Sequence, residues 1–417
     1  MTLPHGIDPD QLDKLAEITV RTGLNLQSGQ ELVVFAPAEA LPLIRRVAVH
    51  AYKAGANAVV PFFTDDEMTL ARFLHAPSES FDHASEWYYE GIAKALENGA
   101  ARLSILGNDP MLLAHQDPDC AARLSKAVSR AAKPATKPIA NFDVNWCVTA
   151  FPGAAWASQV FPSEAPEKAQ KMLMDMIFNA SRLEGPDPVA NWDAHSRNLK
   201  TRIDWLNTCR FSELRYRGPG TDLTIGLPDG HVWKGGRSLA GNGVAFQPNI
   251  PTEEVFTCPH ADRVSGLVSG TKPLSYQGQL IDGIKVRFEA GKAVSAHAAK
   301  GQDALRELLE TDEGACRIGE VALVPDSSPI SRSGVLFYNT LFDENASCHL
   351  AFGQSYSSTI EAGSGLPLST LRERGCNQSM IHVDWMIGSA QLDIDGVSKT
   401  GEIVHVMRKG EWAVSLD

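Results

Sequence analysis

The sequence predicts two folded parts, an α/β N-terminal domain with a mainly parallel sheet and an α+β C-terminal domain. Its 417 residues are too many for one ordinary hydrophobic core. The first half alternates short apolar runs with helix-length segments, which is typical of parallel strands joined by helices. From Glu213 onward the pattern changes to short strands and turns. We therefore place the domain boundary near residue 210, with domains at 1–210 and 211–417.

Capping and turn residues locate the elements of the first half. A helix is predicted to begin at Asp8, because this capping aspartate is followed by Pro9 and, three positions after the cap, by Gln11. Apolar runs predict strands at 31–35, 58–63 and 102–107, and the segments between them predict helices over 41–53, from Asp65, and after Pro110. No G-x-G-x-x-G or P-loop follows a strand, so nucleotide binding is not favoured. We expect this domain to serve packing, dimerisation or substrate enclosure.

Shorter elements are expected after a helical and loop-rich stretch at 142–207. The segments 223–227 and 231–233 read as two strands joined by a Pro-Asp-Gly turn. The segment 284–294 reads as a second hairpin, and 304–309 as a helix. These elements predict the α+β character of the second domain.

Composition excludes several classes of partner. The chain has 50 acidic residues against 38 Lys and Arg, a formal charge of -12, which repels nucleic acid and anionic lipid. No apolar run reaches the length of a membrane helix, and the N-terminus lacks the pattern of an export signal. The seven cysteines are scattered and form no C-x-x-C, which fits reduced thiols. We expect a cytoplasmic protein with no nucleic acid or membrane partner.

Four short segments of the second half carry residues of the kind that bind metal ions. They hold Glu253 and Glu254, then Glu320, then Glu344 and His349, and finally His382 and Asp384. His382 and Asp384 are two residues apart in a strand-like run, so their side chains share a face and can share an ion. Glu320 lies within a short apolar strand, where a buried carboxylate requires a cation or strong donors. A histidine paired with a core aspartate would be the purely structural alternative for His382.

Together the residues Glu254, Glu320, Glu344, His349, His382 and Asp384 form a mixed oxygen and nitrogen ligand set. Zn²⁺, Co²⁺, Mn²⁺ and Mg²⁺ accept such ligands. Carboxylates outnumber histidines, which favours two ions over one, because a carboxylate can bridge two cations and offset their repulsion. Two neighbouring ions would hold an activated water and polarise a scissile carbonyl.

In this order the four segments resemble the M29 family of metallopeptidases, of the aminopeptidase T and aminopeptidase S type. The matching strings are 249–257, Gly319-Glu320, 339–349 and 382–384. The resemblance implies that Glu254, Glu320, His349, His382 and Asp384 occupy metal-ligand positions, with Glu320 as a bridging ligand and Glu344 at the second ion. Trp385 departs from the phenylalanine that the family pattern leads us to expect. This departure concerns substrate preference more than the metal chemistry.

The resemblance also implies roles for two further residues. Tyr356 matches a tyrosine that assists the reaction, although an ordinary half-buried tyrosine would look the same in the sequence. Glu253 is the candidate general base, or else a residue that orients Glu254. The resemblance further implies a homodimer with an enclosed active site.

The hypothesis is a metallo-aminopeptidase that hydrolyses the N-terminal peptide bond of peptide substrates with a two-metal-activated water. Two other readings of the ligand set stay open. One is a different dinuclear metallohydrolase, for example a phosphoesterase, although few basic residues surround the four segments. The other is a non-catalytic metal-binding homologue.

Overall fold

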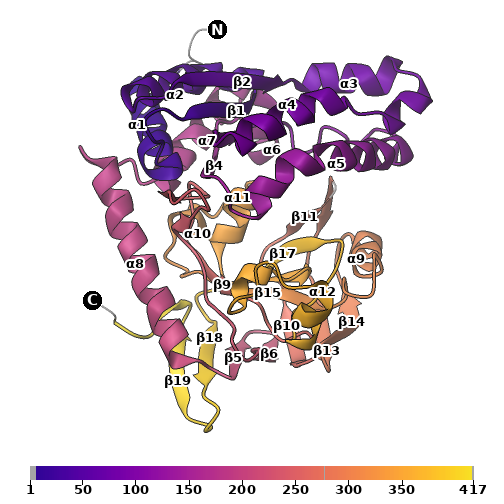
Figure 1. The fold of residues 1–417 in the computed structure, drawn as a ribbon. Coiled ribbons are helices and arrows are strands. Elements are labelled where there is room, and N and C mark those ends of the chain that lie inside the picture. Colours follow the sequence, from indigo (N-terminus) through magenta and orange to yellow (C-terminus); the bar gives the residue numbers. More distant parts are fainter. Residues whose placement is uncertain (1–5, 277, 416–417) are drawn as a thin grey trace. The chain divides into compact units, whose positions relative to one another are not determined.

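The computed structural model describes residues 6–276 and 278–415, which divide into two compact units (Figure 1). The first unit contains residues up to His195 together with Arg237–Pro251. The second contains Ser196–Gly236 and Thr252 onward. All six candidate metal ligands therefore lie in the second unit. Among the described residues, no helix is both long and apolar enough to cross a membrane.

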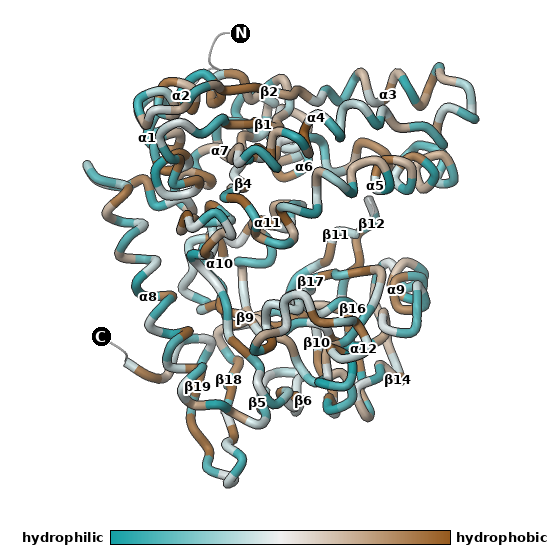
Figure 2. The backbone as a smooth tube through the Cα atoms, in the orientation of Figure 1, coloured by the Kyte–Doolittle hydropathy of each residue, from teal (hydrophilic) through white to brown (hydrophobic). Residues whose placement is uncertain are grey.

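A parallel four-stranded sheet of order β2-β1-β3-β4 forms the centre of the first unit. Its central strand β1 is coloured largely hydrophobic in Figure 2, as a strand covered on both faces must be. The helices pack in pairs, α1 on α2, α4 on α5 and α6 on α7. The elements are α1 (Pro9–Ile18), β1 (Glu31–Pro37), α2 (Leu41–Lys53), β2 (Ala58–Thr64), α3 (Asp66–His75), α4 (Glu86–Glu97), β3 (Ala101–Leu106), α5 (Pro118–Ala140), β4 (Trp146–Ala150), α6 (Ala154–Val160), α7 (Pro166–Ala180), β7 (Ser238–Leu239) and β8 (Ala245–Phe246).

Local capping chemistry explains where these helices begin. The Asp8 carboxylate accepts the backbone N–H groups of Asp10 and Gln11, which confirms the predicted start of α1. The helix expected after Pro110 begins only at Pro118, so that prediction was early by eight residues. Asp117 rather than Asp109 caps this helix, since the Asp117 carboxylate accepts the Asp119 N–H. Asp109 instead accepts the Met111 N–H within a turn.

Two large sheets and the two-stranded sheet β11-β12 build the second unit. An eight-stranded antiparallel sheet has the order β14-β13-β10-β6-β5-β18-β19-β20, and a four-stranded antiparallel sheet has the order β17-β16-β15-β9. Helix α8 (Pro188–Cys209) leads into this unit. The remaining elements are β5 (Glu213–Gly218), β6 (Thr221–Gly226), β9 (Val255–Thr257), β10 (Val264–Ser269), β11 (Leu274–Tyr276), β12 (Gln279–Ile281), β13 (Lys285–Glu289), β14 (Lys292–His297), α9 (Gln302–Leu309), β15 (Ile318–Leu323), α10 (Pro329–Ser333), α11 (Thr340–Asp343), η4 (Glu344–Ala346), β16 (His349–Gly353), α12 (Leu368–Glu373), β17 (His382–Met386), β18 (Asp393–Val397), β19 (Ile403–Arg408) and β20 (Glu411–Trp412).

The structure confirms the hairpin expected at 284–294, as β13 and β14, and the helix α9. It contradicts the hairpin expected around the Pro-Asp-Gly turn. The turn forms, with the His231 N–H donating to the Pro228 carbonyl, but the segment after it does not pair with β6. The Val232 N–H donates to Thr359 and the Lys234 N–H to Phe256, so distant segments take up its hydrogen bonds.

Candidate metal centre

One face of the sheet β17-β16-β15-β9 carries four of the candidate ligands, Glu320, His349, His382 and Asp384. Directly opposite residues in neighbouring antiparallel strands point to the same face. Asp384 lies opposite Ala351, which lies opposite Glu320 on the next strand. His382 lies opposite Gly353, and His349 opposite Ala322. Small residues, Ala322, Ala351 and Gly353, therefore lie directly opposite the ligands on this face, so no bulky side chain separates Glu320 from Asp384.

The other face of the same strands is part of the hydrophobic core. Val321, Leu350, Phe352 and Trp385 are buried there, and the rings of Phe352 and Trp385 stack with centroids 5.0 Å apart. This packing holds the strands in register beneath the ligands. The two-residue period that the sequence indicated for His382 and Asp384 is confirmed by β17.

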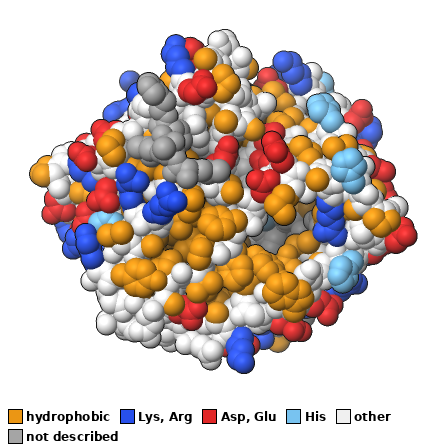
Figure 3. Space-filling model, turned by 90° about the horizontal axis from the view of Figure 1, so that it is seen from above, with side chains coloured by type: hydrophobic (Ala, Val, Ile, Leu, Met, Phe, Trp, Pro, Cys, Tyr) orange, Lys and Arg blue, Asp and Glu red, His pale blue; other side chains and the backbone are white. Residues whose placement is uncertain are grey.

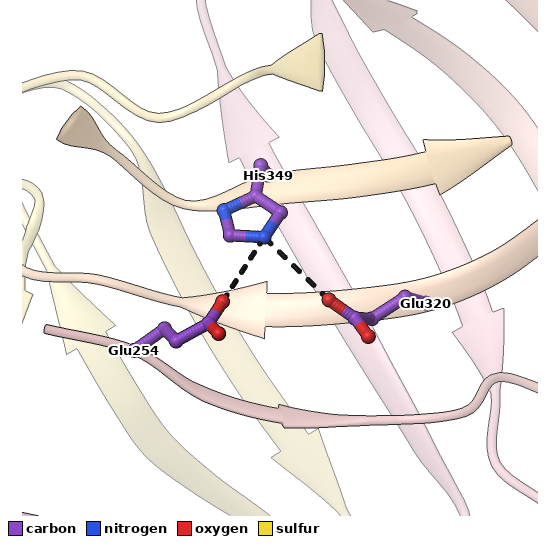
Figure 4. Close-up of side chains that lie close together, drawn as sticks. All are labelled: Glu254, Glu320 and His349. Carbon is purple, nitrogen blue, oxygen red and sulfur yellow. Dashed lines mark ion pairs between the residues drawn. The ribbon is translucent and has the colours of Figure 1, made fainter. Parts of the chain in front are cut away.

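His349 stands between the two glutamates Glu254 and Glu320 (Figure 4). Its Nε2 atom lies 3.2 Å from Glu254 Oε2 and 3.6 Å from Glu320 Oε1. Glu254 comes from the segment directly before β9, Glu320 from β15 and His349 from β16. All three side chains are buried. This first group brings together residues that are up to 95 positions apart in the sequence.

A second group forms on the other side of Glu320. His382 Nε2 lies 3.4 Å from Asp384 Oδ1 and 3.9 Å from Glu320 Oε2. In each of the two groups, one ligand atom from every residue lies within 4.8 Å of the others. Glu320 belongs to both groups and faces His349 with one carboxylate oxygen and His382 with the other. Glu320 is thus the one residue that the two groups share among the described residues.

The polar atoms of these groups fit divalent cations. Glu254 Oε2, His349 Nε2 and Asp384 Oδ1 are buried and make no well-aligned hydrogen bond with a described residue. Buried polar atoms without partners cost free energy unless an ion or water satisfies them. Carboxylate oxygens and imidazole nitrogens are also the donors that zinc and similar ions prefer. The residues present therefore suit metal binding.

Proton affinities in the cluster reflect the crowding of like charges. Burial, together with the nearby carboxylates of Glu254 and Asp384, raises the pKa of Glu320 to about 7. Burial alone would lower the pKa of His382, but Asp384 and Glu320 raise it to about 9. Burial opposes charge on His349 as well, yet Glu254 and Glu320 bring its pKa well above the usual value. Positive charge is thus strongly favoured at the centre of the cluster.

Backbone carbonyls set the orientation of both imidazoles. His382 Nδ1 lies 2.7 Å from the Gln354 carbonyl oxygen, and His349 Nδ1 lies 3.2 Å from that of Ser347. A carbonyl can only accept, so Nδ1 donates to it, and Nε2 is left facing the cluster as the nitrogen that can release its proton to bind an ion. Metal-binding histidines are commonly held in this way. Sequence reasoning missed these carbonyls, because a backbone acceptor leaves no side-chain signal.

The three other predicted site residues lie at different depths around the two groups. Among the described residues, neither group includes Glu344, Glu253 or Tyr356. The pKa of Glu344 is raised by burial and by the charges of Glu254 and Asp384, which places its carboxylate close to both. Glu253 is buried, with 4% of its surface exposed.

Tyr356 packs against the second group. Its ring centroid lies 4.7 Å from that of His382. Although 47% of the Tyr356 surface is exposed, partial desolvation of its hydroxyl group and the carboxylates of Glu320 and Asp384 hold the pKa of the phenol above its ordinary value. The hydroxyl group therefore keeps its proton at neutral pH and is available as a hydrogen-bond donor beside the cluster. A cavity of about 40 Å³ also borders Asp384, with Leu274, Tyr338 and Met386 in its wall.

Comparisons with known proteins agree with this geometry. Residues 8–412 match the sequence model of the family described as thermophilic metalloprotease (M29). Aminopeptidase T of Thermus thermophilus is 46% identical over 404 residues, covering 97% of this chain and 98% of the relative. Aminopeptidase 2 of Geobacillus stearothermophilus is 45% identical over 413 residues, covering 97% and 98%.

Solved structures give the same result for the fold. The structure of wild-type AmpT from Thermus thermophilus superposes with a TM-score of 0.92 at 46% identity, covering 97% of this chain and 99% of that one. A 2,5-dihydroxypyridine dioxygenase from Pseudomonas putida shares the fold at a TM-score of 0.53, covering 98% of this chain and 99% of that one, but only 12% identity. The fold alone thus does not determine the reaction. The sequence match over nearly the whole chain does identify the family, and this protein belongs to the M29 metalloproteases.

Proposed function

We propose that this protein is an aminopeptidase that binds two divalent ions and removes N-terminal residues from peptides. One observation carries the proposal, namely that Glu320 directs its two carboxylate oxygens toward two different groups of ligands. Membership of a metalloprotease family and the names of its aminopeptidase relatives support the reaction type.

Each group would hold one ion. Glu254, Glu320 and His349 would bind the first ion, and Glu320, His382 and Asp384 the second. The family resemblance supports Glu344 at the second ion, and we propose it as a further ligand there; its carboxylate senses the charges of both Glu254 and Asp384. Zn²⁺, Co²⁺, Mn²⁺ and Mg²⁺ all suit this ligand set. When bound, such ions activate a water molecule and polarise the substrate carbonyl.

Side chains near the ligands would handle protons and charge. The Tyr356 hydroxyl group, which stays protonated, would donate a hydrogen bond to the oxygen of the scissile carbonyl as negative charge develops on it. The Glu253 carboxylate would accept a proton from water and deliver it to the leaving amine. A carboxylate of the cluster would bind the free amine of the substrate, which limits cleavage to one residue from the end.

Hydrolysis of leucine p-nitroanilide tests the proposal. The protein should lose activity on treatment with a chelator and regain it when Zn²⁺, Co²⁺ or Mn²⁺ is added. An N-acetylated leucine p-nitroanilide should not be cleaved, because it lacks the free amine. The variants Glu320→Gln and His382→Ala should each abolish activity. A well-folded wild-type protein whose activity no added metal restores would defeat the proposal.

The role of Glu253 can be separated from that of a residue that orients Glu254. As a general base, Glu253→Gln should lower kcat by 10²-fold or more, on the order of the usual contribution of general base catalysis, and leave metal affinity unchanged. If Glu253 instead positions Glu254, the variant should lose metal affinity. Zn²⁺ titration and kcat, measured on the same preparation, distinguish the two roles.

The setting of the enzyme is also part of the proposal. We propose a homodimer whose interface involves the first unit. That unit exposes the large apolar side chains of Tyr52, Phe63, Met68, Leu74 and Trp87, and apolar side chains gather on the face drawn in Figure 3.

We propose a cytoplasmic location, which is supported by seven free cysteines. The first unit would then contribute packing, dimerisation and enclosure of the substrate.

A further inference from the structure

Asn345 is a fully buried polar residue that contacts two of the segments carrying candidate ligands. It lies in η4, directly after Glu344, and none of its surface is exposed. Its Oδ1 atom accepts the backbone N–H of Glu253 at 2.6 Å. Its Nδ2 atom donates to the Leu341 carbonyl at 3.0 Å and lies 3.4 Å from Glu344 Oε1.

The chemistry of these partners fixes the orientation of the amide. A backbone N–H can only donate, and a backbone carbonyl can only accept. Oδ1 must therefore face Glu253 and Nδ2 must face Leu341, so the amide cannot be flipped without losing both bonds. The second hydrogen on Nδ2 is then directed at the Glu344 carboxylate. The backbone of Asn345 is itself held, since the Ser328 hydroxyl group donates to its carbonyl at 3.0 Å.

The Asn345 amide contacts two candidate ligand segments, those of Glu254 and Glu344, at points that lie outside the paired strands of the sheet. Strand β9 pairs with β15 only from Val255 onward, so Glu254 stands just before the first paired residue of β9. Glu344 lies on a short helical turn outside the sheet. The amide of Asn345 therefore connects the residue next to one candidate ligand with the carboxylate of another, across 92 positions of sequence.

We propose that Asn345 is a positioning residue, which sets the placement of Glu254 against Glu344 through the hydrogen bonds of its amide to the Glu253 backbone and the Glu344 carboxylate. The inference rests on the proposed metal site. A hydrogen bond to Oε1 would leave Oε2 of Glu344 for an ion. Loss of such a supporting residue typically lowers metal affinity by about 10- to 100-fold.

Zn²⁺ titration against a chromophoric chelator tests this role without relying on activity. Asn345→Ala removes all the amide bonds, and Asn345→Asp keeps the acceptor for the Glu253 N–H while removing both donors. Both variants should bind Zn²⁺ at least tenfold more weakly than the wild-type protein. Asn145→Ala is the matched control, because Asn145 is an equally buried asparagine of the first unit that donates to the Leu24 carbonyl. It should destabilise the fold and leave Zn²⁺ affinity unchanged.

A double-mutant cycle with Glu344→Gln then separates positioning from a general structural role. If Asn345 acts through Glu344, Asn345→Ala, which adds no charge beside Glu344, should cost much less affinity in the Glu344→Gln background than in the wild-type protein. Equal losses in both backgrounds, wild-type affinity in Asn345→Asp, or an equal loss in Asn145→Ala would overturn the inference. A wild-type protein that binds no Zn²⁺ would instead refute the proposed function. Asn345→Asp also keeps the test informative if Asn345→Ala does not fold.

Discussion

Replacing Glu320 by glutamine should make the metal-free protein more stable and the metal-bound protein less stable. In the absence of metal, the Glu320 carboxyl has a pKa raised to about 7 from its usual 4.5. A raised carboxyl pKa destabilises the fold progressively as the pH rises above the unfolded value of 4.5, and fully above about 7, because the unfolded chain ionises more easily. At pH 8 this cost is about 3 kcal/mol, at roughly 1.4 kcal/mol for each pKa unit.

Glutamine keeps the shape of the side chain and removes this charge. Glu320→Gln should therefore raise the free energy of unfolding in chelator at pH 8 by about 1–3 kcal/mol, the lower value allowing for amide hydrogens without ideal partners. The advantage should disappear as the pH falls toward 5, where the wild-type carboxyl is protonated in the fold. Urea unfolding at the two pH values measures both quantities.

Added metal should make the wild-type protein more stable than Glu320→Gln. An ion at a hundred times its dissociation constant stabilises the fold by about 2.7 kcal/mol, so two ions would give the wild-type protein about 5 kcal/mol. Glu320→Gln removes a ligand shared by both groups and should gain little from Zn²⁺. Glu310→Gln, at an exposed glutamate at the end of α9, should behave like the wild-type protein throughout. A variant that is less stable in chelator, yet fully stabilised by Zn²⁺, would refute this reasoning.

Three further predictions concern the surroundings of the cluster. Metal affinity should fall at least tenfold for each pH unit below 9, because an ion must displace the proton of His382 and, at lower pH, that of Glu320 as well; an affinity independent of pH between 6 and 9, in a chelator competition assay, would contradict this. Tyr356→Phe should retain metal and lose on the order of 10²-fold in kcat; unchanged kcat would make Tyr356 an ordinary packing residue. Trp385→Ala should lower the free energy of unfolding in chelator by about 3–5 kcal/mol, because the stack on Phe352 is lost; urea unfolding that shows a loss below about 1 kcal/mol would mean that the core closes around the gap.

Local sequence patterns predicted the elements that are specified by neighbouring residues. The cap at Asp8, the hairpin at 284–294 and the shared face of His382 and Asp384 all follow from residues a few positions apart. The predicted strand at 231–233 was wrong because its hydrogen bonds go to Thr359 and Phe256. Those partners are distant in the sequence, and no local pattern encodes them.

In the candidate site, too, contacts between residues far apart in the sequence could not be predicted from local patterns. Residue types indicated a metal site, but only the pairing of β15 with β16 and β9 brings His349 to Glu320 and Glu254. Family resemblance supplied that grouping where spacing along the chain did not. Asn345 was missed because its role depends on an N–H group 92 positions away. The roles of Glu253 and Tyr356 stay predictions.

Anomalous diffraction from crystals grown with Zn²⁺ tests the central claim most directly. The account predicts two peaks, one within about 2.0–2.2 Å of ligand atoms of Glu254, Glu320 and His349, and one at the same distances from Glu320, His382 and Asp384. Each peak should lie against a different oxygen of Glu320. A single peak, or two peaks that do not share Glu320, would contradict it.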